Sequence, residues 1–217
     1  MLRPHYFAVA EPFENTIIIS KSRFITTLLP INDFEDAMAK VKAISKKYSD
    51  ATHNCYAFIS NESATEQRFS DDGEPQGTAG VPMLEVLKKR GMYKTLAVVT
   101  RYFGGIKLGA SGLVGAYSAS VSEALDKAKT VKMIWAVAIK ITISYGIYKK
   151  VEEVCVSKGG QILSVQYGND VELIVAIPEE TSNDVIAKIV DVTLDKAKIE
   201  IVDRSYVAFV GNTLSRS

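Results

Sequence analysis

The chain has little of the residue types from which metal centres and disulfide frameworks are built. Its 217 residues include two cysteines, Cys55 and Cys155, and two histidines, His5 and His53. The cysteines are far apart in the sequence and lie in apolar stretches, so we expect buried free thiols, as in a reducing cytoplasm. A zinc site needs three or four ligands close together, and this composition therefore predicts no metal site.

Long apolar runs and a charge excess are also absent. No run approaches the roughly 20 residues that cross a bilayer, and we expect no membrane association and no signal peptide. The net charge is +1, although residues 1–132 carry 17 Lys and Arg against 14 Asp and Glu, and residues 133–217 carry 9 against 11. This asymmetry slightly favours an anionic partner for the first part. The composition predicts a cytoplasmic protein of one or two domains.

Glycine, by contrast, is concentrated in two blocks. Residues 70–80 read SDDGEPQGTAG and residues 99–112 read VTRYFGGIKLGASG, and together they hold seven of the fourteen glycines. Glycine concentrates where the backbone needs a positive φ or approaches another group closely. Each block leads into a helical pattern, and the first amides of a helix have no partner within it. The two blocks therefore predict an anion site built largely from backbone.

The second block indicates which residues form that site. Gly104 and Gly109 have the spacing of a P-loop, but Ala110 replaces the lysine, which excludes a nucleotide triphosphatase of that type. Arg101 and Lys107 bring positive charge to the predicted helix start. We expect an anion or nucleic-acid site formed by Arg101, Gly104, Gly105, Lys107, Gly109 and Ser111. The alternative is that these glycines only let a helix pack closely on a sheet.

The first block contributes a second candidate cluster, formed by His53, Asp71, Asp72 and Glu74. The three carboxylates have the chemistry to hold Mg²⁺ or to act as acid and base. A turn explains the same residues without chemistry, because Asp, Gly and Pro each favour turns, and we prefer that interpretation. Strand alternation places His53 on the same side as Cys55, and we interpret His53 as a hydrogen-bonded residue beside the acidic turn. No catalytic constellation is identified, so no catalytic residue and no cofactor is assigned.

Hydrophobic periodicity divides the chain into two domains of the α+β class. In the first part it predicts strands at 16–20, 23–31, 54–60, 67–70 and 95–102, and helices that begin at Asn32, near Pro82 and near Ser111. The helical pattern stops near Lys129, and we place the boundary between domains 1–132 and 133–217. The second part has the order β-α-β-β-α-β, which is the ferredoxin-like arrangement.

Three motifs carry a resemblance to a known family. They resemble the motifs of the IMPACT family in its bacterial, YigZ-type form, and they are His53-Asn-Cys-Tyr-Ala57, Ser70–Gly80 and Arg101–Gly109. The resemblance covers about residues 15–130, and the remainder is similar to the small C-terminal domain of bacterial members. It implies a first domain with the fold of elongation factor G domain IV, which we take as a mixed sheet with helices on one face. It also implies a second domain similar to elongation factor G domain V.

The resemblance also suggests a role. Eukaryotic relatives regulate translation by opposing activation of a starvation-responsive kinase of an initiation factor. The family has no accepted catalytic residues that could be assigned to positions in this sequence. We therefore expect a non-enzymatic, translation-associated protein that binds the ribosome, structured RNA or another anionic partner through the glycine-rich basic loop. The alternative is an enzyme or sensor for a small phosphorylated or carboxylate metabolite, or for phosphate itself. The sequence leaves open whether there is any enzymatic activity.

Overall fold

The computed structural model describes residues 5–209, which divide into two compact units. The first unit extends to Lys132, and the second comprises Met133–Phe209. Each unit contains its own sheet and helices, so the chain is of the α+β class, as predicted. Within the described residues, no helix combines the length and the apolar character that a membrane crossing requires.

The sheet of the first unit contains five strands. Their order is β2 (Phe13–Ile19), β3 (Ser22–Pro30), β6 (Thr95–Tyr102), β4 (His53–Ile59) and β5 (Gln67–Ser70), and the short strand β1 (His5–Val9) precedes them. Every neighbouring pair in this sheet is antiparallel, so the expectation of a mixed sheet is wrong. The reason is that β6 inserts between β3 and β4 and is antiparallel to both.

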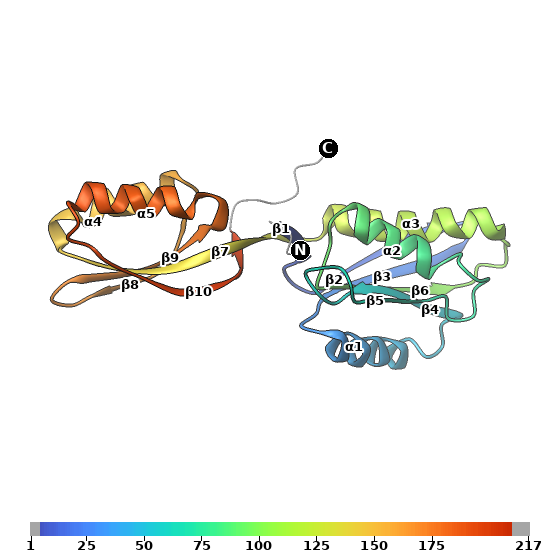
Figure 1. Ribbon diagram of the computed structural model, residues 1–217. Coiled ribbons are helices and arrows are strands. Elements are labelled where there is room, and N and C mark those ends of the chain that lie inside the picture. Colours follow the sequence, from blue (N-terminus) through green and yellow to red (C-terminus); the bar gives the residue numbers. More distant parts are fainter. Residues whose placement is uncertain (1–4, 210–217) are drawn as a thin grey trace. The chain divides into compact units, whose positions relative to one another are not determined.

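Helices cover both faces of this sheet rather than one. Helix α1 (Phe34–Lys47) lies on one face, and α2 (Gly80–Lys89) and α3 (Gly109–Lys127) lie on the other (Figure 1). Two layers are needed because β6 is apolar on both sides: its Leu96 and Val98 pack with α1. The neighbouring Ala97 and Val99 are also fully buried and alternate to the opposite face. The expectation of helices on one face is therefore incorrect.

Two helices begin at residues other than those expected. Asp33, not Asn32, caps α1, because Asp33 has an extended backbone and its side chain accepts the amide of Asp36 at 2.8 Å. The Asp36 carboxylate pairs with Lys40 and accepts the amide of Asn32, and these contacts lower the pKa of Asp36. Helix α3 begins at Gly109, two residues before Ser111, and no side chain caps it.

The second unit is ferredoxin-like. It contains β7 (Thr130–Ile143) from Met133 onward, the 3-10 turn η1 (Tyr145–Ile147), α4 (Tyr148–Ser157), β8 (Gln161–Tyr167), β9 (Val171–Pro178), α5 (Glu179–Thr193) and β10 (Lys198–Phe209). The elements follow the order β-α-β-β-α-β that the sequence pattern predicted. In the sheet β7 pairs with β9 and β10, β9 also pairs with β8, and β1 pairs with β7. Alternating residues of β7 and β9, such as Ile139, Ile141, Leu173 and Val175, form the core with α4 and α5.

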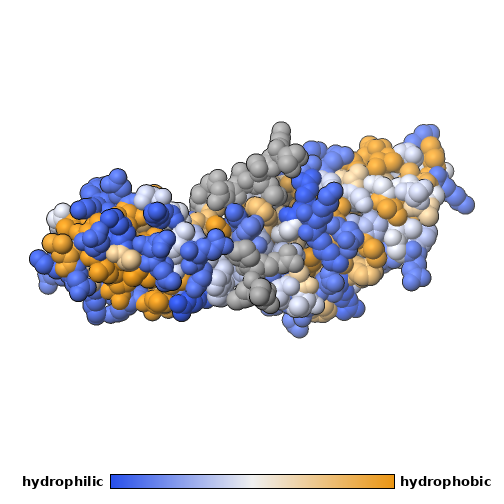
Figure 2. Space-filling model, turned by 45° about the horizontal axis from the view of Figure 1, so that its top comes forward, coloured by the Kyte–Doolittle hydropathy of each residue, from blue (hydrophilic) through white to orange (hydrophobic). Residues whose placement is uncertain are grey.

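The surface of each unit is mixed in character. Figure 2 shows hydrophobic residues among hydrophilic ones on the visible face of both units. Isolated exposed apolar side chains are normal for globular proteins. Exposed apolar residues become informative where they border a pocket that also contains charged groups, and this occurs in the first unit.

Candidate functional site

A row of three side chains crosses the first sheet beneath α3. Arg101 on β6 is paired in register with Phe24 on β3 and with His53 on β4. Residues directly opposite in an antiparallel ladder point to the same face, and strand alternation places this row on the side away from α1. The Arg101 guanidinium lies over the Phe24 ring, at 5.4 Å from its centre. The register therefore brings two candidate residues, His53 and Arg101, side by side.

Glu74 joins this row from the acidic block. Its Oε1 accepts hydrogen bonds from Arg101 Nη1 at 2.6 Å and from the Tyr117 hydroxyl on α3 at 2.8 Å. The Arg101 and Glu74 side chains are only 6% and 3% exposed. Ser22 accepts a second, longer bond from Arg101 Nη2. Arg101 is thus a buried, neutralised cation rather than a free ligand at the surface.

His53 completes the polar cluster. Its Nδ1 lies 2.7 Å from the backbone carbonyl of Asp72, and because a carbonyl only accepts, Nδ1 carries the hydrogen. The other ring nitrogen, Nε2, lies 3.8 Å from Glu74 Oε2. Gly73, at φ +86°, passes so close to the ring that a Cβ there would lie 3.4 Å from Nδ1. The acidic turn therefore fixes both the orientation and the tautomer of His53.

Asp71 and Asp72 perform structural tasks. The Asp71 carboxylate accepts three backbone amides, those of Gly77 at 2.8 Å, Ala79 at 3.0 Å and Gly80 at 2.8 Å, and so stabilises the start of α2. Asp72 accepts the amide of Asn54 at 2.6 Å. The interpretation of this block as a turn is therefore correct for Asp71 and Asp72. Of the three carboxylates, Glu74 alone contacts Arg101 and lies near His53.

Cys55 lies behind the cluster and is not poised as a nucleophile. Its thiol contacts the Asp71 carbonyl at 2.9 Å and the Tyr117 hydroxyl at 3.3 Å. Burial raises the pKa of Cys55 to about 12 and, more strongly, that of Tyr117. A thiol reacts as its thiolate, so Cys55 stays inert near neutral pH. Within residues 5–209, no group of His, Cys, Asp and Glu side chains has the composition of a metal site.

The glycines of the second block have separable roles. A Cβ on Gly104 would lie 2.0 Å from the backbone of Lys21, so glycine is required where this loop crosses the turn between β2 and β3. Gly105 and Gly109 have positive φ values of +85° and +71° and face open space. Gly104 therefore fits the alternative that these glycines serve close packing, whereas Gly109 provides the positive φ with which α3 begins.

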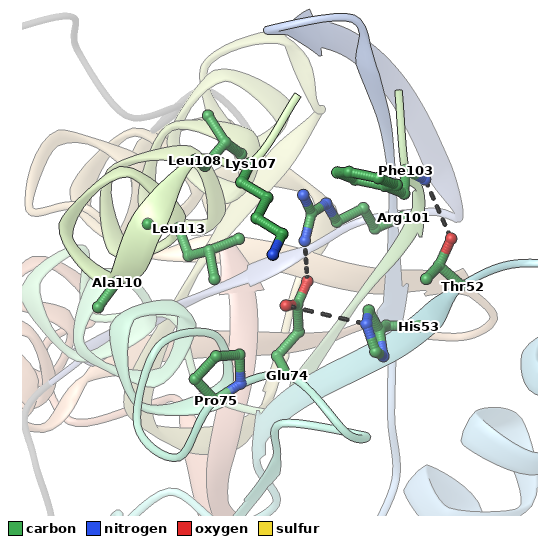
Figure 3. A pocket seen from close by; sticks show the side chains of 11 residues that line it. Thr52, His53, Glu74, Pro75, Arg101, Phe103, Lys107, Leu108, Ala110 and Leu113 are labelled. Carbon is green, nitrogen blue, oxygen red and sulfur yellow. Dashed lines mark hydrogen bonds and ion pairs between the residues drawn. The ribbon is translucent and has the colours of Figure 1, made fainter. Parts of the chain in front are cut away.

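These elements enclose a pocket of about 310 Å³ at the N-terminus of α3 (Figure 3). It is lined by Thr52, His53, Glu74, Pro75, Arg101, Phe103, Lys107, Leu108, Gly109, Ala110 and Leu113. Lys107 is exposed, its ammonium points into the pocket, and it has no ion-pair partner in the part of the chain that the structure describes. The first amides of α3 have no side-chain cap. Both features favour a negative group at this end of the pocket.

The pocket unites the two candidate clusters only in part. Its lining includes five of the predicted residues, namely Arg101, Lys107, Gly109, His53 and Glu74. The other five are not part of the lining: Gly104, Gly105, Ser111, Asp71 and Asp72. Sequence reasoning missed the apolar lining, notably Phe103 and Leu113, and the buried hydroxyl of Tyr117. Phe103 lies within the glycine-rich block, and Leu113 and Tyr117 share a helical face four residues apart, so both signals are present in the sequence.

The fold and the pocket define a class: a two-unit α+β protein whose first unit carries a pocket with a polar floor and apolar walls at a helix N-terminus. A family model described as the Impact N-terminal domain matches residues 20–125. A second, described as a domain of unknown function (DUF1949), matches residues 141–196. The chain belongs to the IMPACT family, as its motifs suggested.

Individual relatives cover most of the chain. It is 40% identical over 202 residues to the IMPACT family member YvyE of Bacillus subtilis, with 93% of each chain covered. It is 38% identical to the IMPACT family member YigZ of Escherichia coli, over 80% of this chain and 86% of that protein. A crystal structure described as a hypothetical protein is similar with a TM-score of 0.59 and 33% identity, covering 93% of this chain and 99% of the other.

Proposed function

We propose that this protein is a translation-associated regulatory protein that binds phosphate groups of the ribosome or of structured RNA at the N-terminus of α3. The proposal rests on one observation: the N-terminus of α3, which no side chain caps, and the exposed Lys107 both lie at the same pocket. The link to translation comes from IMPACT family membership. The family resemblance also implies two domains similar to domains IV and V of elongation factor G.

The electrostatics of the α3 terminus support an anionic ligand. The helix has 19 residues and no acidic residue in its first turn, so its positive end is not neutralised locally. Lys107 precedes the first turn and adds a full charge. Arg101 is compensated by Glu74, which leaves Lys107 and the backbone amides as the groups expected to meet a phosphate.

Cosedimentation with ribosomes tests this proposal. Binding should weaken steeply from about 50 to 200 mM salt, because neutralised phosphates release counterions. Lys107→Ala should lower affinity and reduce the salt slope by about one unit. Lys42→Ala is the control, since Lys42 is exposed on α1, on the opposite face of the same sheet. No cosedimentation at the lowest salt, or equal effects of the two variants, would contradict the proposal.

A second candidate function rests on the concave shape of the site. Buried groups around Glu74 and His53 form the pocket floor, a geometry suited to a small anionic metabolite that is sensed or converted. Turnover of a phosphorylated or carboxylate compound that disappears in Glu74→Gln, without ribosome binding, would favour this candidate over the first.

A further inference from the structure

The pocket has two chemically different parts. Its floor is polar and consists of His53, Glu74 and Arg101, whereas the walls include Pro75, Phe103, Leu108 and Leu113 (Figure 3). A bare phosphate would use Lys107 and the helix amides but none of the apolar wall. The lining therefore suits a ligand that carries an anionic group on a larger, largely apolar body.

The floor retains unused hydrogen-bonding capacity. Glu74 Oε1 accepts two bonds, whereas Oε2 lies 3.8 Å from His53 Nε2, which is beyond hydrogen-bond distance. Arg101 Nε is buried and has no hydrogen-bond partner among residues 5–209. A buried N–H without a hydrogen-bond partner is destabilising unless another molecule satisfies it. The floor is thus complementary to a ligand with both donor and acceptor groups.

The rim carries an exposed aromatic side chain. Phe103 is 45% exposed, and its neighbour Ile106 is 44% exposed. The Phe103 amide donates to Thr52 Oγ1 at 3.0 Å, which holds the backbone in place at the pocket mouth. The Arg101 guanidinium lies over this ring, 5.6 Å from its centre. An aromatic ring held beside a cationic site is the arrangement that proteins use to stack nucleobases.

We propose that this pocket binds a single nucleotide unit. Its phosphate lies at Lys107 and the first amides of α3, its base lies against Phe103, and sugar or base donors satisfy Glu74 Oε2. The pocket volume of about 310 Å³ is at the lower end of the range for small-ligand sites, which fits one nucleotide rather than a longer segment. This inference rests on the anion site proposed above and specifies its ligand class.

Titration calorimetry with four probes tests the inference: adenosine 5′-monophosphate, uridine 5′-monophosphate, ribose 5-phosphate and inorganic phosphate. Each nucleotide should bind about tenfold more tightly than ribose 5-phosphate, the gain expected from one stacked base. Phe103→Ala should remove that difference and leave ribose 5-phosphate affinity unchanged. Phe69→Ala is the control, because Phe69 is exposed to a similar 44% on β5 and does not line the pocket. Lys107→Ala should weaken all four probes.

The outcomes separate this inference from the proposed function. Equal affinity for nucleotides and ribose 5-phosphate, or no effect of Phe103→Ala, overturns the nucleotide site while the anion site stands. No Lys107-dependent binding of any phosphate probe overturns both. A final comparison uses single-stranded oligouridylate and a duplex of equal length. Phe103-dependent preference for the single strand identifies RNA as the source of the nucleotide, and preference for the free nucleotides identifies a small ligand.

Discussion

Nη1 of Arg101 and Oε1 of Glu74 lie 2.6 Å apart in the interior of the first unit, although 27 residues separate them in sequence. The two side chains come from different glycine-rich blocks, and the contact ties β6 to the turn before α2. A second bond to the same oxygen, from the Tyr117 hydroxyl, ties α3 to both. The stability of the pocket floor therefore depends on this buried pair.

Removal of either charge alone should destabilise the protein strongly. Glu74→Ala leaves a buried, uncompensated guanidinium, and we expect it to lower the free energy of unfolding by about 3–5 kcal/mol. Arg101→Ala should have a comparable effect through the orphaned carboxylate. The double variant Glu74→Leu, Arg101→Met removes both charges and should recover most of the loss. Urea unfolding of the four proteins measures these differences.

An exposed ion pair provides the matched control for that series. Glu85 pairs with Lys88 at 3.0 Å, but the Glu85 side chain is 63% exposed. Glu85→Ala should therefore change the free energy of unfolding by at most about 1 kcal/mol. If Glu74→Ala were as mild as Glu85→Ala, the buried pair would not hold the pocket together in solution.

Two glycine-to-alanine substitutions should change the free energy of unfolding in opposite directions. Gly104→Ala places a Cβ 2.0 Å from the Lys21 backbone, which forces the loop and the β2–β3 turn apart, and we expect a loss of about 3 kcal/mol or more. Gly115 lies inside α3 with nothing within 4 Å of an added Cβ. Gly115→Ala should raise stability by about 0.5–1 kcal/mol through helix propensity. Thermal unfolding compares the two, and a neutral Gly104→Ala would refute the close contact.

Asp71 should matter for stability and not for ligand binding. Asp71→Ala leaves three amides near the start of α2 without their acceptor, and we expect a loss of about 2–4 kcal/mol. Asp71→Asn, which keeps one acceptor oxygen, should lose about half as much. Phosphate affinity of the folded Asp71→Asn protein should equal that of the unmodified protein. A specific loss of phosphate affinity would instead assign Asp71 to the site.

The buried thiol predicts a dependence of stability on alkaline pH. Burial raises the pKa of Cys55 to about 12, whereas an unfolded cysteine titrates near about 8.5. Below the unfolded pKa the thiol is neutral in both states; above it only the unfolded state loses the proton. This stabilisation is therefore lost as pH rises from about 8.5 towards 12, by about 1.4 kcal/mol per pH unit.

Urea unfolding at pH 8 and pH 10 measures the effect. Stability of the unmodified protein should fall more steeply with pH than that of Cys55→Ala, because the variant lacks this group. Cys155 has a pKa raised to about 11 and is present in both proteins, so its contribution cancels. Identical pH slopes would show that the Cys55 thiolate is as stable in the folded state as in the unfolded one.

The sequence predicts elements well where a single local pattern determines them. Strand β6 has the expected range, 95–102, because it is a short apolar run that lies between segments containing glycine. The start of α1 is shifted from Asn32 to Asp33 because both residues can cap a helix, and only the backbone geometry distinguishes them. The layering of the first sheet could not be predicted, because it depends on where β6 inserts.

The candidate site was predictable as a set of segments but not as a set of contacts. The glycine blocks and Lys107 pointed to the pocket. The pairing of Arg101 with Glu74 is a long-range contact that no local pattern specifies, and it changes Arg101 from an expected free ligand into a buried cation. The residues assigned to the anion site therefore remain predictions, with Lys107 as the side chain best placed to test them.

The row formed by Phe24, Arg101 and His53 has a consequence for how this sequence can change. Because successive strand residues face opposite sides, inserting or deleting one residue in β6 ahead of Arg101 would turn its guanidinium towards α1. The same shift would move Leu96 and Val98 out of the α1 core. The hydrophobic packing and the polar floor of the pocket thus share one register, so a change in strand length cannot alter one of them while the other is kept.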